Sequence, residues 1–235
     1  MFIPYLPTEM TPLYEDNHII IVNKAPGEIV QGDKTGDVPL SDIVKAYLKE
    51  KYAKPGEVFL GVVHRLDRPV SGVVVFAKTS KARSRLNEMF RKGEVHKTYH
   101  AIIPRLATLV KTEKPVLLTH FLTRNEKQNK AYAYTKEVQG SKKATLDYQV
   151  VTTSDRYALL QVNLHTGRHH QIRCQLATAL AAIKGDLKYG SPRSNPDGSI
   201  CLHARKVSFI HPVSKQEINI TAPYPTLPVW GIFAH

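Results

Sequence analysis

The stretch VFLGVVHRLDRPVSGVVVFA, residues 58–77, consists of two apolar runs on either side of a polar segment. Both runs are rich in β-branched residues and have no polar face, so we predict buried strands at 58–63 and 72–77. The residues between them, 64–71, are polar and include Pro69, which predicts a loop joining two strands of the core. One carboxylate, Asp67, lies in this loop between two arginines.

The rest of the chain predicts more strands than helices. Apolar or alternating runs predict strands at 18–23, 96–103, 116–122, 130–136, 144–151, 157–164, 200–209 and 216–221. Helices are expected at 41–50, at 80–92 ending at Gly93, and near 169–183. For the first helix, Ser41 is the expected N-cap, Ile43 and Tyr47 lie on the expected apolar face, and Val44 and Leu48 are further candidates for that face. We therefore expect an α+β fold: one domain, residues 1–235, with a large mixed, mostly antiparallel central sheet flanked by a few helices.

The composition is that of an ordinary globular protein, but the charge is strongly positive. The 235 residues carry 33 Lys or Arg against 20 Asp or Glu, a net charge of +13. This excess favours a polyanionic partner such as nucleic acid, although a merely basic protein would have the same composition. Residues 111–143 are basic and include Tyr132 and Tyr134, so they form either a surface that touches RNA or a solvated hairpin.

Two cysteines, Cys174 and Cys201, are too few for a disulfide scaffold. The N-terminus lacks the features of a secretory signal, and no apolar run approaches the ~18 residues of a membrane span. We expect a cytoplasmic protein that is not bound to a membrane.

Signature motifs of several enzyme classes are missing from the sequence: a phosphate-binding P-loop, a dinucleotide fingerprint, a GxSxG nucleophile elbow, HExxH and CxxC. His170 and Cys174, four residues apart on a predicted helix, could ligate zinc. No other ligand cluster has metal-site spacing, so we expect no metal and interpret Cys174 as a small buried hydrophobic residue.

Two polar segments could carry chemistry. The carboxylate of Asp67 on its loop is a possible nucleophile or base, and the alternative is a structural salt bridge. Residues 166–173, TGRHHQIR, open the helix near 169–183, where backbone N–H groups and the arginines Arg168 and Arg173 could hold an anion. The alternative for this second segment is an ordinary solvated helix start.

Six motifs in one order resemble the RluA-type pseudouridine synthases. They are HRLDRPVSG at 64–72, KTYHA at 97–101, HTGRHHQIR at 165–173, GD at 185–186, YG at 189–190 and LHA at 202–204. The resemblance covers about residues 13–222. It implies that the chain isomerises uridine to pseudouridine in structured RNA, a stem-loop of ribosomal or transfer RNA, and that it needs no cofactor.

The resemblance also assigns roles to residues. Asp67 matches the essential aspartate, and Tyr99 matches the tyrosine that stacks on the target base. Arg173 matches the basic residue that pairs with the aspartate, and Arg168 is the competing candidate. RNA contacts are expected from His64, Arg65, Arg68, His170 and Gln171.

Some features depart from the family pattern. Val70 and His169 stand where threonine is usual, and Lys24-Ala25-Pro26-Gly27 replaces a lysine-proline-glycine motif. Many relatives carry an additional N-terminal RNA-binding domain, for which we expect no room here, and we expect a monomer.

Two other functions would fit part of the sequence. A non-catalytic RNA-binding or RNA-folding protein on the same scaffold would explain the charge, but it does not require both Asp67 and Tyr99. A glycosidic-bond hydrolase would usually need two carboxylates, and neither KTYHA nor TGRHHQIR offers a second one.

Overall fold

The computed structural model describes residues 10–109, 111 and 114–233, so residues 1–9 and residues 112–113 of the basic segment lie outside it. The chain divides into two compact units. The first unit runs through Val95 and adds Lys206–Pro223, and the second takes His96–Arg205 and the chain from Tyr224 onward. The single domain expected from the sequence stays a prediction.

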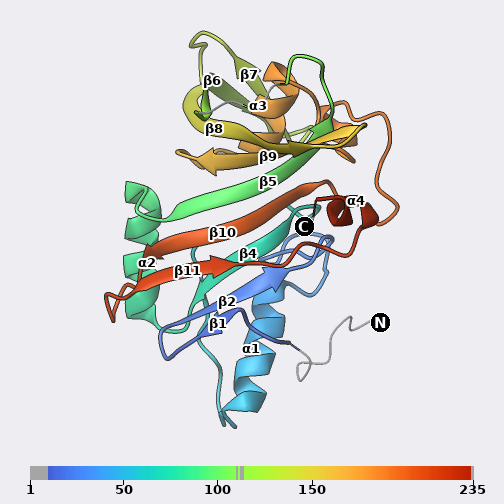
Figure 1. Cartoon of the computed structure of the whole chain (residues 1–235). Helices are drawn as coiled ribbons and strands as arrows, with labels where there is room; N and C mark the ends of the chain where they lie inside the picture. Colours follow the sequence, from blue (N-terminus) through green and yellow to red (C-terminus); the bar gives the residue numbers. More distant parts are fainter. Residues whose placement is uncertain (1–9, 110, 112–113, 234–235) are drawn as a thin grey trace. The chain divides into compact units, whose positions relative to one another are not determined.

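The first unit is built on antiparallel strands and two helices (Figure 1). Strand β1 (Tyr14–Glu15) pairs with β2 (Ile19–Lys24), which pairs with β4 (Ser71–Ala77), and the short β3 (Gly61–Val62) pairs with β4. The second half of β10 (Leu202–Ile210) pairs with β11 (Glu217–Thr221). The helices are α1 (Leu40–Lys51) and α2 (Ser80–Lys92).

One face of this sheet makes the core with α2. Alternate residues of β2 and β4 meet Ala82 and Leu86 of the helix, with Val207 and Phe209 of β10 and Ile218 of β11 in the same cluster. All seven residues of β4 are buried, which confirms that this apolar run is a central strand. The predicted strand at 58–63 is shorter than expected, because only Gly61 and Val62 pair and Phe59 is exposed.

The helix ends test the capping predictions. Helix α2 covers 80–92 as predicted: Thr79 Oγ1 accepts a hydrogen bond from Ala82 N–H, and Gly93 closes the helix with a φ of +75°. The prediction that Ser41 caps α1 is wrong, because α1 begins at Leu40 after an extended Pro39. The N–H groups of Leu40 and Ser41 instead donate to the carbonyls of Ile29 and Val30, so the first turn needs no side-chain cap.

The predicted apolar face of α1 is confirmed for Val44 and Leu48 only. Leu40, Val44 and Leu48 are buried, whereas Ile43 and Tyr47 are only half-buried. Tyr47 uses its hydroxyl to reach Glu15 of β1, at 3.1 Å.

The second unit is an antiparallel sheet with the strand order β5-β9-β8-β6-β7. Its strands are β5 (His96–Pro104), β6 (Val116–Asn125), β7 (Lys130–Tyr134), β8 (Lys142–Thr153) and β9 (Tyr157–Leu164). Helix α3 (Gln171–Ala179) lies against β6 and β7 (Figure 1), and the short η2 (Leu187–Tyr189) and α4 (Pro228–Gly231) complete the unit. The predicted α+β class with mostly antiparallel strands is confirmed.

Helix α3 is shorter than the predicted helix at 169–183. It ends at Ala179, and the following residues leave the helical path to bond β5. Lys184 N–H donates to Ile102 C=O, and Cys201 N–H donates to Lys184 C=O. The apolar period continues through Leu180 and Ile183 in the sequence, but this pairing with the sheet overrides it.

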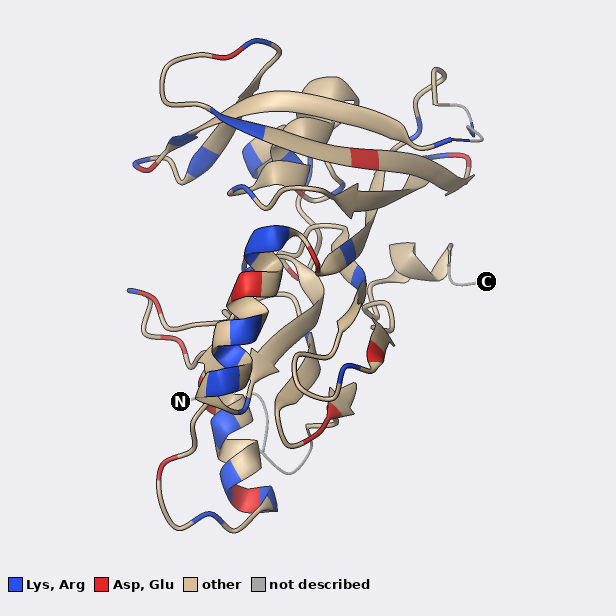
Figure 2. Cartoon of the chain, turned by 90° about the vertical axis from the view of Figure 1, so that its left-hand side faces the viewer, with Lys and Arg blue, Asp and Glu red and all other residues tan. Residues whose placement is uncertain are grey.

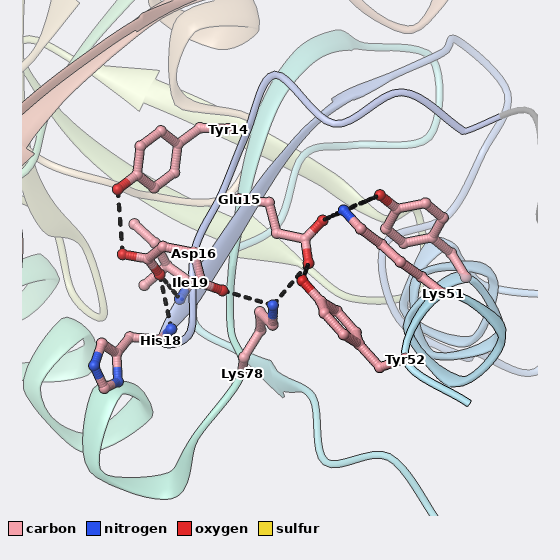
Figure 3. A network of polar contacts seen from close by, with 9 residues as sticks. Tyr14, Glu15, Asp16, His18, Ile19, Lys51, Tyr52 and Lys78 are labelled. Atoms are coloured by element: carbon pink, nitrogen blue, oxygen red, sulfur yellow. Dashed lines mark hydrogen bonds and ion pairs between the residues drawn. The ribbon is translucent and has the colours of Figure 1, made fainter. Parts of the chain in front are cut away.

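A buried carboxylate ties β1 to the end of α1 and to the residue after β4 (Figure 3). Glu15 accepts hydrogen bonds from Lys51 Nζ, Lys78 Nζ and the Tyr52 hydroxyl, each at 2.7 Å. Burial opposes ionisation of Glu15, but these donors win and lower its pKa to about 2. Since the side chains of Glu15 and Lys78 are each only 7% exposed, water screens this ion pair weakly.

We predict that Glu15→Gln lowers the free energy of unfolding by about 2 kcal/mol at neutral pH, because it removes the charge from these hydrogen bonds. The folded carboxyl has the lower pKa, so its stabilisation is full above the unfolded pKa and is lost as pH falls toward about 2. Urea denaturation at several pH values measures this. The exposed Glu50→Gln is the matched control, and equal stability of the two variants would contradict the prediction.

Candidate functional site

A buried lysine holds the loop that carries Asp67 in place. Lys24, at the end of β2, is fully buried, and its Nζ donates to the carbonyls of Ala25 at 2.9 Å, Arg68 at 3.0 Å and Val70 at 2.6 Å. Burial lowers the pKa of Lys24 to about 8, although the negative charges of Glu28 and Asp67 act to raise it. The ammonium therefore fixes the backbone on the C-terminal side of Asp67 and contributes positive charge beside its carboxylate.

Backbone bonds complete the shape of this loop. Val70 N–H donates to Asp67 C=O at 3.0 Å, which closes a turn, and Gly27 N–H donates to Arg68 C=O at 2.9 Å. Asp67 itself is half-buried. The turn and the lysine together hold the Asp67 backbone in one position.

Side chains on either side of Asp67 also anchor the loop. His64 Nε2 accepts a hydrogen bond from Val75 N–H of β4 at 2.9 Å, and its ring stacks on Phe90 of α2 with centroids 4.8 Å apart. Arg68 reaches the segment 33–37, where Nη1 lies 2.7 Å from Asp37 Oδ2 and Nη2 donates to Thr35 Oγ1. Both residues thus position the loop, and their RNA contacts stay predictions. Arg65 is exposed.

Tyr99 lies in β5 opposite Val162 of β9 and is 7% exposed. Its neighbour Thr98 donates to Asn163 Oδ1 at 3.0 Å, Asn163 Nδ2 donates to Asp147 Oδ1 at 2.8 Å, and His165 Nε2 lies 2.6 Å from Asp147 Oδ2. The tyrosine therefore stands on a strand that polar side chains cross-link to β9 and β8.

The turn before α3 is held by Gln171. Its Oε1 accepts from the Thr166 hydroxyl at 2.8 Å and from Arg168 N–H at 3.0 Å, while its Nε2 donates to Thr145 C=O at 3.0 Å. Gln171 is 3% exposed, so it supports the turn from the protein interior. The RNA contact expected of Gln171 stays a prediction. His170, which precedes the helix, has a φ of +49°, a strained conformation for a residue with a side chain.

The two arginines of this segment have different environments. Arg168 is exposed, and its Nε donates to Lys143 C=O at 3.2 Å. Arg173 is 5% exposed and binds the buried Asp186 in a bidentate pair, Nε to Oδ2 at 2.7 Å and Nη2 to Oδ1 at 2.8 Å. Asp67 belongs to the first unit and both arginines to the second, so which of them pairs with Asp67 stays a prediction.

His170 and Tyr189 extend this pair into a network. Arg173 Nη1 lies 3.2 Å from His170 Nε2, and His170 Nδ1 lies 3.0 Å from the Tyr189 hydroxyl. Because a guanidinium can only donate, His170 Nε2 must accept, which puts the ring proton on Nδ1, facing Tyr189. The Tyr189 oxygen also accepts from Ala131 N–H at 2.8 Å, and burial raises the pKa of this hydroxyl.

The zinc pair considered from the sequence is disfavoured by these contacts. Both ring nitrogens of His170 have protein partners, and Cys174 Sγ donates to Ala131 C=O at 3.3 Å. Burial raises the pKa of the Cys174 thiol to about 11, which opposes the thiolate that zinc requires. Cys174 is a small buried residue, as interpreted from the sequence.

Sequence reasoning gave no role to Lys24, Asp186 or Tyr189, although motifs containing them had been noted. Asp186 could have been expected from the need to pair a buried charge. If an arginine of the predicted helix is buried, its guanidinium needs a carboxylate partner. The signal for Lys24 is weaker, because two of its three partners are backbone carbonyls 44 and 46 residues away.

We predict that Lys24→Met loosens the loop, because three carbonyls lose their donor. The expected cost is about 2 kcal/mol in the free energy of unfolding, with faster hydrogen exchange of the Val70 amide. Lys49→Met on the exposed side of α1 is the control. A Lys24→Met variant with unchanged stability and unchanged Val70 exchange would show that the lysine does not hold the loop.

Comparison with known proteins covers both units. A family model described as RNA pseudouridylate synthase matches residues 18–178. A ribosomal large subunit pseudouridine synthase D of Xylella fastidiosa is 31% identical over 91% of this chain, which spans 65% of that relative's length. A tRNA pseudouridine synthase C of Vibrio parahaemolyticus is 29% identical, with 92% of this chain and 91% of the relative covered.

Solved structures agree on the fold. Human RNA pseudouridylate synthase domain containing 4 superposes with a TM-score of 0.75, at 22% identity, over 95% of this chain and 92% of that one. In the described part of the chain, no helix combines the length and apolar character needed to cross a membrane.

Proposed function

Because the chain belongs to the RNA pseudouridylate synthase family, we propose that it converts uridine to pseudouridine in structured RNA. The observation that carries this proposal is the family match over residues 18–178, a span that contains Asp67, Tyr99, Arg168 and Arg173. The named relatives divide between ribosomal and transfer RNA, so the proposed substrate class is a structured ribosomal or transfer RNA. We further propose that the protein acts as a monomer in the cytoplasm.

The proposed reaction is an isomerisation. The bond between C1′ of the ribose and N1 of the base breaks, a bond between C1′ and C5 forms, C5 loses its hydrogen and N1 gains one. Nothing is oxidised or reduced overall, so the reaction needs no electron carrier. We propose Asp67 as the nucleophile or acid–base group, since it is a carboxylate on a loop that Lys24 and the 67–70 turn hold in place.

We propose that Tyr99 supports the flipped base and that Arg173 serves as the basic partner of Asp67. A guanidinium has five N–H donors, so Arg173 can keep Asp186 and still serve a second carboxylate. Arg168 remains the alternative and suits a phosphate contact better, because it is exposed. Flipping a base costs a few kcal/mol, which stacking and phosphate contacts can offset.

The positive charge gathers on α2 (Figure 2). Lys81 and Arg83 are exposed there, and the Arg83 stem lies against Gly61, where a Cβ would come within 2.7 Å of it. The last turn carries Arg91 and Lys92, both paired with Glu88. By contrast, α1 carries three lysines against two acids, Asp42 and Glu50. We propose that α2 contacts RNA phosphates.

We predict that Asp67→Asn abolishes pseudouridine formation while RNA binding persists, because the amide has neither the charge nor the nucleophilicity of a carboxylate. Ribosomal and transfer RNA transcripts would be incubated with each protein and mapped by carbodiimide labelling and reverse-transcription stops. Asp155→Asn, at an exposed bend, is the matched control. New stops with Asp67→Asn equal to those with the wild type would remove the aspartate from the mechanism.

We also predict that RNA binding weakens steeply with salt, because each neutralised phosphate releases counterions. Replacing Lys81 and Arg83 with alanine should flatten the plot of log K against log salt, by roughly 0.7–0.9 per lost phosphate contact. Lys45→Ala with Lys49→Ala on α1 is the matched control pair. Equal slopes for wild type, the α2 pair and the α1 pair would place the phosphate contacts elsewhere.

A further inference from the structure

The β6–β7 hairpin presents two tyrosines on an open surface. Thr123 pairs with Tyr132 and Phe121 with Tyr134, so strand alternation puts both tyrosines on one face of the hairpin. The opposite face, with Ala131 and Ala133, packs on Cys174 of α3. The hairpin core therefore fills one side only and leaves the aromatic side to the solvent.

That open face is hollowed into a groove, here called the hairpin groove. It has a volume of about 600 Å³ and is lined by Thr123, Arg124, Asn125, Glu126, Lys127, Tyr132 and Tyr134. Tyr132 is 37% exposed and Tyr134 is 40% exposed. Water thus reaches both aromatic side chains.

The charge around the rings is mainly positive. Lys130 Nζ lies 5.5 Å from the centroid of the Tyr132 ring, and Arg124 and Lys127 line the groove with a single acid, Glu126. The lining contains no aliphatic side chain larger than the threonine methyl group. Such a surface suits a polar, negatively charged and planar partner better than an apolar peptide.

The hairpin groove is held in shape before any ligand arrives. Lys188 Nζ of η2 donates to the carbonyls of Gln128 and Asn129 in the turn, at 3.0 and 3.2 Å. The Tyr132 hydroxyl donates to Gln128 Oε1 at 2.5 Å, and Gln128 N–H donates to Asn125 Oδ1 at 3.0 Å. A ligand would find the ring of Tyr132 already oriented, which reduces the entropy lost on binding.

We propose that the hairpin groove binds an unpaired stretch of the RNA substrate, with bases stacked on Tyr132 and Tyr134 and phosphates beside Arg124 and Lys127. Aromatic platforms flanked by cations are the means by which proteins hold single-stranded nucleic acid without reading its sequence. The inference rests on the proposed function for the identity of the polymer. It adds an RNA contact beyond those proposed at the Asp67 loop and at α2, carried by a hairpin that has no part in the proposed chemistry.

Substitution of the two tyrosines tests the stacking. The probe is a fluorescein-labelled oligouridylate of about 10 nucleotides, with an RNA duplex of the same length for comparison, and binding is read by anisotropy. Tyr132→Ala with Tyr134→Ala should weaken oligouridylate binding roughly 25-fold or more, since each of the two stacked bases contributes at least about fivefold. Tyr132→Phe with Tyr134→Phe keeps both rings but loses the hydroxyl bond to Gln128, so it should retain most of the binding that the double alanine variant loses.

Two further variants keep the test decisive. Phe59→Ala removes an exposed aromatic ring from the other unit and should leave binding unchanged. Lys127→Glu is exposed on the turn and should fold even if the double alanine variant does not, and it should weaken binding severalfold at low salt.

Oligouridylate binding that is equal in the wild type and the double alanine variant would overturn the proposal, as would no binding by the wild type. If the double alanine variant does not fold, unchanged binding by Lys127→Glu would overturn it. Pseudouridine mapping with the wild type tests the proposed function separately. Tyrosine-dependent binding without pseudouridine would leave the groove assignment intact and reject the enzyme.

Discussion

A cation taken out of water has to find acceptors inside the protein, and this requirement organises the loop that carries Asp67. The ammonium of Lys24 has three protons, and the structure supplies three backbone carbonyls, those of Ala25, Arg68 and Val70. Two of these carbonyls, those of Arg68 and Val70, lie one and three residues after Asp67 in the sequence. The cost of burying the charge is offset only when the loop adopts this path, so the lysine selects the conformation of the loop.

The same requirement shapes the start of α3. Arg173 is buried in the first turns of the helix, and Asp186 meets it with both carboxylate oxygens. That pair sets the tautomer of His170 and, through it, the bond to Tyr189. The segments that resemble catalytic motifs are thus rigid because buried charges leave them few alternatives. Rigid positioning of reacting groups lowers the barrier to a reaction, because their geometry is fixed before the reaction begins.

Local patterns predicted the elements well, and tertiary bonds account for the differences. The β-branched run at 72–77 and the Gly93 stop of α2 needed only neighbouring residues, and both are confirmed. Ser41 was expected as a cap because the sequence could not reveal that the carbonyls of Ile29 and Val30 receive the first N–H groups of α1.

The candidate site divides in the same way. The motifs located the segments around Asp67 and Arg173, but the partners that hold them, Lys24 and Asp186, act over distances in the chain that no periodicity reports. His64 and Gln171 brace the backbone, and the RNA contacts expected of them stay predictions.

The first unit is not continuous in the chain, and this has a consequence for synthesis on the ribosome. Its core needs Val207, Phe209 and Ile218, which follow Val95 by more than a hundred residues. At about 5–20 residues per second, the apolar faces of β2 and β4 wait several seconds or longer for these partners. The second unit, nearly complete by Arg205, is free to fold during that interval. Until residues 207–218 are made, the apolar faces of β2 and β4 lack part of their core and are open to chaperone binding.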